Sequence, residues 1–130
     1  MIIRDKYLAS ALVNEISILR KLSSEFIVKF LDTCESPTNY YIVQEYCEEG
    51  DLKRYLKDKK KLSEREALSI LTSILSGYEV LIKNGIVHRD IKPANILISS
   101  GGYKLADFGF ATSFKNMLDS HVGTPYYMSP

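Results

Sequence analysis

The residues best suited to chemistry lie together in segment 88–95, which reads His-Arg-Asp-Ile-Lys-Pro-Ala-Asn. Asp90 supplies a carboxylate that can accept a proton from a hydroxyl group, and Lys92 places a positive charge near it. Asn95 adds an uncharged oxygen of the kind that a hard divalent cation binds. Pro93 fixes its own φ and favours an extended Lys92, so the loop is stiff before a substrate arrives. Such a loop is suited to phosphoryl transfer.

A second acidic motif follows this loop. The tripeptide Asp-Phe-Gly occupies positions 107–109, and an apolar run, a Ser-Ser-Gly-Gly turn and a strand-like segment separate it from Asn95. In this order the two motifs resemble the catalytic loop and the metal-binding motif of eukaryotic protein kinases. The lysine two residues after Asp90 resembles the serine/threonine branch of that family rather than the tyrosine branch.

The resemblance implies a role for each polar residue of these motifs. Asp90 would orient and deprotonate the acceptor hydroxyl, and Lys92 would neutralise charge on the transferring group. Asn95 and Asp107 would hold Mg²⁺ against the phosphates of ATP. By this resemblance, ATP and Mg²⁺ are the expected cofactors, and a serine or threonine hydroxyl of a protein is the expected acceptor.

Composition argues against several other classes of protein. The chain has 130 residues, of which 45% are hydrophobic and 25% charged, with a formal net charge of +1. These values predict a soluble chain of about one-domain length, and they indicate no nucleic-acid partner. No apolar run approaches the roughly 20 residues of a membrane span, so we expect a cytoplasmic protein, with a nuclear one as an alternative. Cys34 and Cys47 fit no metal-binding spacing and are expected to be free thiols.

The first predicted helix spans residues 9–21, where apolar residues recur at the spacing of one buried face. Glu15 falls on this face, so its carboxylate needs either a cationic partner or access to water. The resemblance favours a partner, because kinases pair such a glutamate with a phosphate-binding lysine from the preceding strand. Family spacing would place that lysine immediately before Met1, and no glycine precedes Gly50 to form the family's glycine-rich loop.

Local signals predict the elements that position these motifs. Two β-rich runs, residues 26–34 and 40–46, predict an antiparallel hairpin, and residues 52–57 a short helix. A capping box at 63–66 should open a long helix, which Asn-Gly at 84–85 should end. The residues expected along its buried stripe are Ala67, Ile70, Leu71, Ile74, Leu75, Tyr78 and Ile82. This helix is interpreted as a core element that supports the catalytic loop.

The end of the second predicted strand resembles the hinge between the two lobes of a kinase. The resemblance implies that the carbonyl of Glu45 and the amide of Cys47 bind the adenine edge, and that Asp51 lies near the ribose. Leu97 would lie beneath the adenine, and Gln44 would be the gatekeeper. Without the resemblance, the same segment fits an ordinary strand followed by a helix that Asp51 caps. Both interpretations stay open here.

His88 is interpreted as a structural residue rather than a general base. In kinases the histidine at this position packs on the phenylalanine of the Asp-Phe-Gly motif, which is Phe108 in this sequence. The same comparison implies that Leu19 and Phe30 continue this apolar column.

Residues 110–122 are expected to form the activation loop. In kinases the arginine beside the catalytic aspartate, here Arg89, binds a phosphorylated residue of that loop. Ser120 best matches the phosphorylated position, and an unmodified loop is the alternative. Residues 123–130 resemble the substrate-positioning segment, which would bring Thr124, a further regulatory candidate, close to the catalytic loop.

The predicted fold class is α+β, in the two-lobe form of protein kinases but truncated. Residues 1–44 would be the remainder of the small lobe, 45–51 the hinge, and 52–130 the first half of the large lobe. Because the rest of the large lobe would normally cover the long helix, we expect exposed apolar surface on these residues.

We therefore interpret the chain as part of a serine/threonine protein kinase, most similar to the autophagy-initiating ULK/ATG kinases and next to the NIMA-related kinases. The main alternative is a non-catalytic fragment or pseudokinase that acts as a binding module, because the lysine and the glycine-rich loop are missing. A phosphotransferase for small molecules is a third hypothesis. If the protein begins at Met1, we expect only very weak phosphoryl transfer.

Overall fold

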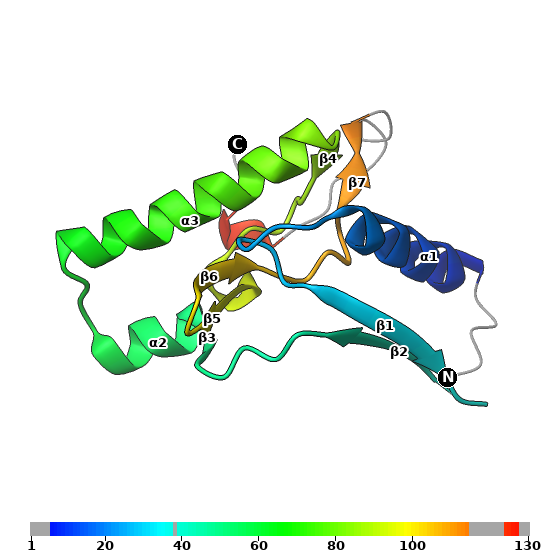
Figure 1. Ribbon diagram of the computed structural model, residues 1–130, viewed down its shortest axis with the longest axis horizontal. Helices are drawn as coiled ribbons and strands as arrows, with labels where there is room; N and C mark the ends of the chain where they lie inside the picture. Colours follow the sequence, from blue (N-terminus) through cyan, green and yellow to red (C-terminus); the bar gives the residue numbers. More distant parts are fainter. Residues whose placement is uncertain (1–5, 38, 115–123, 128–130) are drawn as a thin grey trace.

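The structure is a computed structural model that describes residues 6–37, 39–114 and 124–127 (Figure 1). It confirms the predicted α+β fold class, since helices are combined with short strands. In chain order the elements are α1 (Lys6–Lys21), β1 (Phe30–Glu35), β2 (Tyr40–Gln44), β3 (Gly50–Asp51), α2 (Leu52–Lys59), α3 (Glu64–Lys83), β4 (Ile86–Val87), η1 (Pro93–Asn95), β5 (Ile96–Ser99), β6 (Gly102–Leu105), β7 (Thr112–Ser113) and η3 (Pro125–Tyr127).

The described strands form small antiparallel sheets. β1 pairs with β2, β5 lies between β3 and β6, and β4 pairs with β7. Figure 1 shows α1 and the β1–β2 hairpin on one side, α2 and α3 on the other, and the β3–β5–β6 sheet between them. The catalytic loop precedes β5 and the 107–109 motif follows β6, so this central sheet brings the two motifs together. The Ala106 amide continues the pairing by donating to the Asn95 carbonyl at 2.9 Å.

Both ends of α3 lie where local signals predict them. The Ser63 hydroxyl accepts a hydrogen bond from the Glu66 amide, and the Glu66 carboxylate accepts one from the Ser63 amide. This reciprocal capping box satisfies amides that the first helical turn would otherwise leave unpaired. Gly85 follows the helix with φ +67°, a left-handed conformation that glycine adopts without a steric penalty.

α1 and α2 are both longer than predicted. α1 begins at Lys6 rather than at residue 9, and α2 ends at Lys59 rather than at residue 57. The Asp51 carboxylate caps the start of α2, as predicted by the interpretation of this segment as a strand followed by a capped helix. At the other end, Lys60 adopts φ +64° and its amide donates to the Leu56 carbonyl at 2.9 Å, which closes the helix.

The prediction of a strand over residues 26–34 is only partly correct. β1 begins at Phe30, because the residues before it pair with β6 instead. The Val28 amide donates to the Leu105 carbonyl at 2.9 Å, and the Leu105 amide donates to the Phe26 carbonyl at 2.9 Å. The β-rich run is thereby divided between the hairpin and the central sheet. β2 also ends two residues before its predicted end at residue 46.

The hydrophobic core lies where α1, α3 and the central sheet meet. Leu19 and Phe108 are almost completely buried in it, and Phe30 packs against the same cluster, in agreement with the expected apolar column. Cys34 is exposed and Cys47 is buried, and both are free thiols as predicted. The buried apolar cluster comprises Ile18, Leu19, Leu22, Ile27, Val28, Leu52, Ile70, Leu81, Ile86, Ile96, Ile98, Leu105, Ala106, Phe108 and Ala111.

One face of α3 is more exposed than its predicted core role implies. Ile70 and Leu81 are buried, but the side chains of Leu71, Leu75 and Ile82 have relative exposures of 51%, 57% and 47%. α3 packs on β4 and β6, and no described element covers its opposite face. This agrees with the expected exposure of apolar surface. Among the described helices, none combines the length and the apolar character needed to cross a membrane.

Gly77 is where α3 approaches the central sheet most closely. A Cβ atom at this position would lie 2.9 Å from the Phe26 carbonyl oxygen and 3.0 Å from a methyl carbon of Leu105. Both neighbours belong to the pairing between residues 26–28 and β6, so they cannot move without disturbing the sheet.

We predict that Gly77→Ala lowers the free energy of unfolding by about 1–2 kcal/mol, because the steric conflict outweighs the gain in helix propensity. Urea denaturation measures this change. Thr72→Ala, at an exposed position of the same helix, is the matched control and should be neutral or slightly stabilising. A Gly77→Ala protein as stable as the control would contradict the close approach.

Candidate active site

The loop between β4 and η1 holds its polar residues in fixed backbone conformations. Arg89 adopts φ +67°, which is uncommon for a residue with a side chain and is often found at functional sites. Lys92 is extended, with φ −156° and ψ 161°, as the proline after it predicts. Pro93 then begins η1, which carries Asn95. The sharp turn and the rigid exit bring both ends of the loop back to Asp90.

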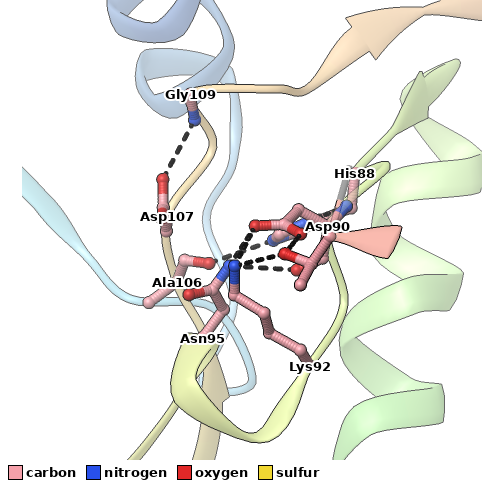
Figure 2. Close-up of polar contacts among 8 residues, drawn as sticks. His88, Asp90, Lys92, Asn95, Ala106, Asp107 and Gly109 are labelled. Atoms are coloured by element: carbon pink, nitrogen blue, oxygen red, sulfur yellow. Dashed lines mark hydrogen bonds and ion pairs between the residues drawn. The ribbon is translucent and has the colours of Figure 1, made fainter. Parts of the chain in front are cut away.

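The Asp90 carboxylate is the centre of the site. It is only 4% exposed, and it accepts hydrogen bonds from Lys92 Nζ at 2.7 Å and from Asn95 Nδ2 at 2.9 Å on Oδ2. The Thr124 hydroxyl donates to its Oδ1 at 2.5 Å and accepts a hydrogen bond from Lys92 Nζ at 2.6 Å. Figure 2 shows Lys92 and Asn95 converging on Asp90. The structure thus brings together Asp90, Lys92, Asn95 and Thr124, as predicted.

These contacts determine the charge of Asp90. Burial alone raises the pKa of this carboxyl, but the hydrogen bonds from Lys92, Thr124 and Asn95 outweigh that effect, so the pKa lies below its ordinary value. Asp90 is therefore ionised at neutral pH and can only accept hydrogen bonds. A hydroxyl group placed beside it will direct its proton towards the carboxylate.

His88 fixes the peptide group of Asp90 rather than donating or accepting a substrate proton. Its side chain is fully buried, and its ring lies 4.9 Å from the Phe108 ring, which is the predicted contact. The Asp90 amide donates to Nδ1 at 3.3 Å, so Nε2 carries the hydrogen and donates to the Ala106 carbonyl at 3.0 Å. Burial lowers the pKa of His88, with a partial offset from the bond to Ala106, so the neutral ring is favoured.

A second group of acidic residues lies at the 107–109 motif. Asp107 adopts φ +61°, its side chain is exposed, and Oδ1 accepts a hydrogen bond from the Gly109 amide at 3.3 Å. Glu15 of α1 reaches the same place, since a Cβ atom on Gly109 would lie 3.4 Å from Asp107 Oδ1 and 3.9 Å from Glu15 Oε2. Burial, and then the charge of Asp107, raise the pKa of Glu15. No ion pair of the described residues includes Glu15, so the expected cationic partner does not come from this part of the chain.

The oxygen atoms available here fit a magnesium ion. Asn95 uses its amide nitrogen on Asp90, whereas no described residue donates a hydrogen bond to its amide oxygen. Asp107 follows Ala106, whose amide donates to the Asn95 carbonyl, and the Asp107 side chain is exposed. Among the described residues no group of three or more His, Cys, Asp and Glu side chains could hold a metal. Mg²⁺ commonly uses one or two protein oxygens and completes its shell with water and substrate phosphates, so this small donor set is suited to it.

The hinge segment leaves two main-chain groups available for a ligand. The Glu45 amide donates to the Lys29 carbonyl and the Cys47 carbonyl accepts from Gly50, but the Glu45 carbonyl and the Cys47 amide have no partner among the described residues. These are the two groups expected to bind the adenine edge. Asp51 of β3 lies directly opposite Leu97 of β5, so the residues expected near the ribose and beneath the adenine are neighbours.

Two side chains hold the backbone that follows the Asp-Phe-Gly motif. Arg89 Nε donates to the Phe110 carbonyl at 2.7 Å, and Asn14 Nδ2 of α1 donates to the Ala111 carbonyl at 3.0 Å. The start of the expected activation loop is thus tied to both the catalytic loop and α1. Ser120 lies outside the described residues.

Sequence reasoning missed two of the polar residues at this site. Asn14 is adjacent to Glu15 on α1, and its position next to this candidate site residue was the only available signal. Lys104 pairs with the Glu45 carboxylate across 59 positions, and no local pattern indicates this contact.

The comparisons with known proteins agree with this geometry. The family model described as "Protein kinase domain" matches residues 3–130. The chain is 38% identical to serine/threonine-protein kinase ATG1b of Arabidopsis thaliana, over 97% of this chain and 19% of that protein. It is 40% identical to serine/threonine-protein kinase unc-51 of Caenorhabditis elegans (92% and 16%) and 37% identical to serine/threonine-protein kinase atg1 of Dictyostelium discoideum (98% and 20%). The chain thus spans about a fifth of the length of these curated relatives. The predicted resemblance to protein kinases, and to the ULK/ATG group, is confirmed.

The burial of neutral His88 predicts a pH dependence of stability. The unfolded chain takes up a proton on this residue near pH 6.5, whereas the folded chain resists it because the folded pKa is depressed. The free energy of unfolding should therefore fall below about pH 6.5, by at most about 1.4 kcal/mol per pH unit from this residue. Denaturant titrations between pH 7 and pH 5 measure the slope.

His88→Phe should flatten this dependence, because phenylalanine binds no proton in either state. Ile86→Val, which removes one buried methyl group from the adjoining strand, is the control. It should cost about 1 kcal/mol at every pH and keep the wild-type slope. Equal slopes for wild type and His88→Phe would show that His88 is not buried in its neutral form.

Proposed function

Because the chain belongs to the protein kinase domain family, we propose that the protein transfers the γ-phosphoryl group of ATP to a serine or threonine hydroxyl of a protein substrate. The observation that supports this proposal best is the placement of Thr124. Its hydroxyl donates to the Asp90 carboxylate and accepts from the Lys92 ammonium group. A substrate hydroxyl in the same position would have its proton directed at a base and its oxygen beside a positive charge.

The reaction follows from this arrangement. The acceptor oxygen attacks the γ-phosphorus, its proton passes to Asp90, and the bond between the γ-phosphorus and the bridging oxygen of ADP breaks. Lys92 neutralises charge that develops on the transferring group, and Thr124 positions the acceptor segment. Little covalent chemistry is required of the protein, so alignment and electrostatic stabilisation supply most of the rate.

The cofactors of the proposed reaction are ATP and Mg²⁺. The amide oxygen of Asn95 and the carboxylate of Asp107 would hold the metal ion, which supplies positive charge to the phosphates. The Glu45 carbonyl and the Cys47 amide would bind the adenine edge. Leu97 would lie beneath the base, with Asp51 near the ribose, because these two residues face each other across β3 and β5.

The same proposal assigns the parts of the chain. Residues 1–44 would belong to the small lobe, 45–51 to the hinge, and 52–130 to the large lobe. Glu15 would pair with the phosphate-binding lysine. Burial and the charge of Asp107 raise the pKa of Glu15, and a lysine beside it would offset both effects.

Regulation would act through Arg89, which already holds the Phe110 carbonyl at the start of the activation loop. A phosphate on Ser120 would add a dianion that this guanidinium group can bind. Thr124 is engaged by Asp90 and Lys92, so we assign it to substrate positioning. The likeness to ATG1b and unc-51 supports a place among the autophagy-initiating kinases. As part of the same proposal, the protein would act in the cytoplasm.

One observation favours a second candidate function, a kinase-like binding module without catalysis. Glu15 lies beside Asp107, and no ion pair among the described residues gives it a cationic partner. Such a module would bind nucleotide or a protein partner but transfer no phosphate.

Asp90→Asn tests the proposal in the full-length polypeptide that carries this sequence. We expect kcat for a serine-containing protein substrate to fall by about 10²–10⁴-fold, because asparagine cannot accept the proton. The dissociation constant for MgATP should stay within about twofold, since Asp90 does not contact the adenine subsite. Radiolabel transfer and calorimetry measure the two quantities.

Asp58→Asn, at an exposed position of α2, is the matched control and should leave both quantities unchanged. Retained transfer in Asp90→Asn would show that another group is the base. A wild-type protein that binds MgATP but transfers no phosphate would favour the binding module.

A further inference from the structure

An ion pair joins the expected hinge to the strand that leads to the metal-binding motif. Lys104 Nζ of β6 donates to Glu45 Oε1 at 2.9 Å and to Oε2 at 3.0 Å. Both side chains are partly buried, with relative exposures of 13% for Lys104 and 26% for Glu45. The pair is therefore better shielded from water and salt than a surface ion pair, which typically contributes little.

The Glu45 carboxylate also makes a main-chain contact on its other side. The Lys29 amide donates to Oε1 at 2.6 Å, and the Glu45 amide donates in return to the Lys29 carbonyl at 2.9 Å. One side chain thus joins the segment after α1, the hinge and β6. The hydrogen bonds from Lys104 and Lys29 outweigh the effect of burial and keep the pKa of Glu45 below its ordinary value.

The register of the central sheet places this pair at the proposed nucleotide site. Asp51 of β3 lies opposite Leu97 of β5, and Leu97 lies opposite Lys104 of β6. Residues directly opposite each other in antiparallel strands project from the same face of the sheet. Lys104 is therefore the next residue in a row that already contains the two expected nucleotide contacts, and from there it reaches Glu45.

The side chain and the main chain of Glu45 have separate tasks. The carboxylate is occupied by Lys104 and Lys29, whereas the carbonyl has no described partner. When the Glu45 carboxylate is held, the peptide groups on either side of Glu45 can rotate less. One of these groups contains the Glu45 carbonyl, and the Cys47 amide follows two residues later. The orientation of the Glu45 carbonyl is thus linked to a cation whose hydrogen bonds go to the Glu45 carboxylate.

We propose that Lys104 is a positioning residue for nucleotide binding: through Glu45 it fixes the hinge so that the Glu45 carbonyl and the Cys47 amide meet the adenine edge together. This inference rests on the proposed function. It adds a residue from outside the hinge and the catalytic loop, and it implies that the ion pair acts on ATP affinity rather than on the chemical step.

Lys104→Met in the full-length polypeptide tests the inference, because it removes the charge and keeps much of the side-chain length. We expect the dissociation constants of MgATP and ADP, measured by calorimetry, to rise by about tenfold. The KM for ATP should rise in parallel, whereas kcat at saturating ATP should stay within about twofold. Lys104→Arg should keep the wild-type affinity within about threefold, because arginine can make the same bidentate contact.

Glu48→Gln is the matched control on the same hinge. Glu48 Oε1 accepts a hydrogen bond from the Ser100 amide at 2.8 Å, but its side chain is exposed and it has no lysine partner among the described ion pairs. We expect Glu48→Gln to change the dissociation constant of ADP by less than about twofold.

The outcomes separate the inference from the function on which it rests. Wild-type affinity for ADP in Lys104→Met overturns the inference, as does a fall in kcat without a change in the KM for ATP. If Lys104→Met does not fold, Lys104→Gln, which also removes the charge, takes its place with the same expectation. Wild-type ADP affinity in Lys104→Gln, or weak ADP binding by folded Lys104→Arg, then overturns the inference. A wild-type protein that binds neither MgATP nor ADP overturns the proposed function itself.

Discussion

The structure depends most on the burial of one negative charge. A carboxylate that is 4% exposed would be strongly disfavoured without partners, and Asp90 obtains them both from neighbouring residues and from one that lies 34 positions away in the sequence. Lys92 lies in the loop itself, Asn95 lies in η1, and Thr124 immediately precedes η3. Each element must therefore be in place for the charge to be stable. The contacts that stabilise the buried Asp90 carboxylate also orient the Thr124 hydroxyl group, so one hydrogen-bond network serves stability and the proposed function.

The two acidic groups of the site differ in their electrostatics, and this difference separates their tasks. Asp90 is paired with a lysine, and its pKa is lowered, which suits a group that must stay ionised beside a hydroxyl. Glu15 lies next to Asp107 without a described cation, and burial and like charge raise its pKa. Uncompensated negative charge at this position favours a nearby cation. In the proposed function, this difference would suit Asp90 to proton acceptance and Asp107 to holding the metal ion.

Predictions from the sequence were accurate where the signal is local and weaker where tertiary contacts decide. The capping box at Ser63 and Glu66 needs only neighbouring residues, and both ends of α3 were predicted correctly. Residues 26–29 have strand propensity, but the pairing of Val28 with Leu105 removes them from β1, and no local pattern contains that information. The cluster around Asp90 was expected from a family resemblance, whereas the pairing of Glu45 with Lys104 joins residues 59 positions apart and was not found.

The charge state of Asp90 is the central physical claim, and a titration of its carboxyl carbon by ¹³C NMR tests it most directly. In the wild-type protein the midpoint should lie below that of an ordinary aspartate, which titrates near pH 4, because the hydrogen bonds to the carboxylate outweigh the effect of burial on its pKa. Lys92→Met should move the midpoint upward, because it removes a cation and leaves the burial. A wild-type midpoint at or above the ordinary value, or no response to Lys92→Met, would contradict the network described for this site.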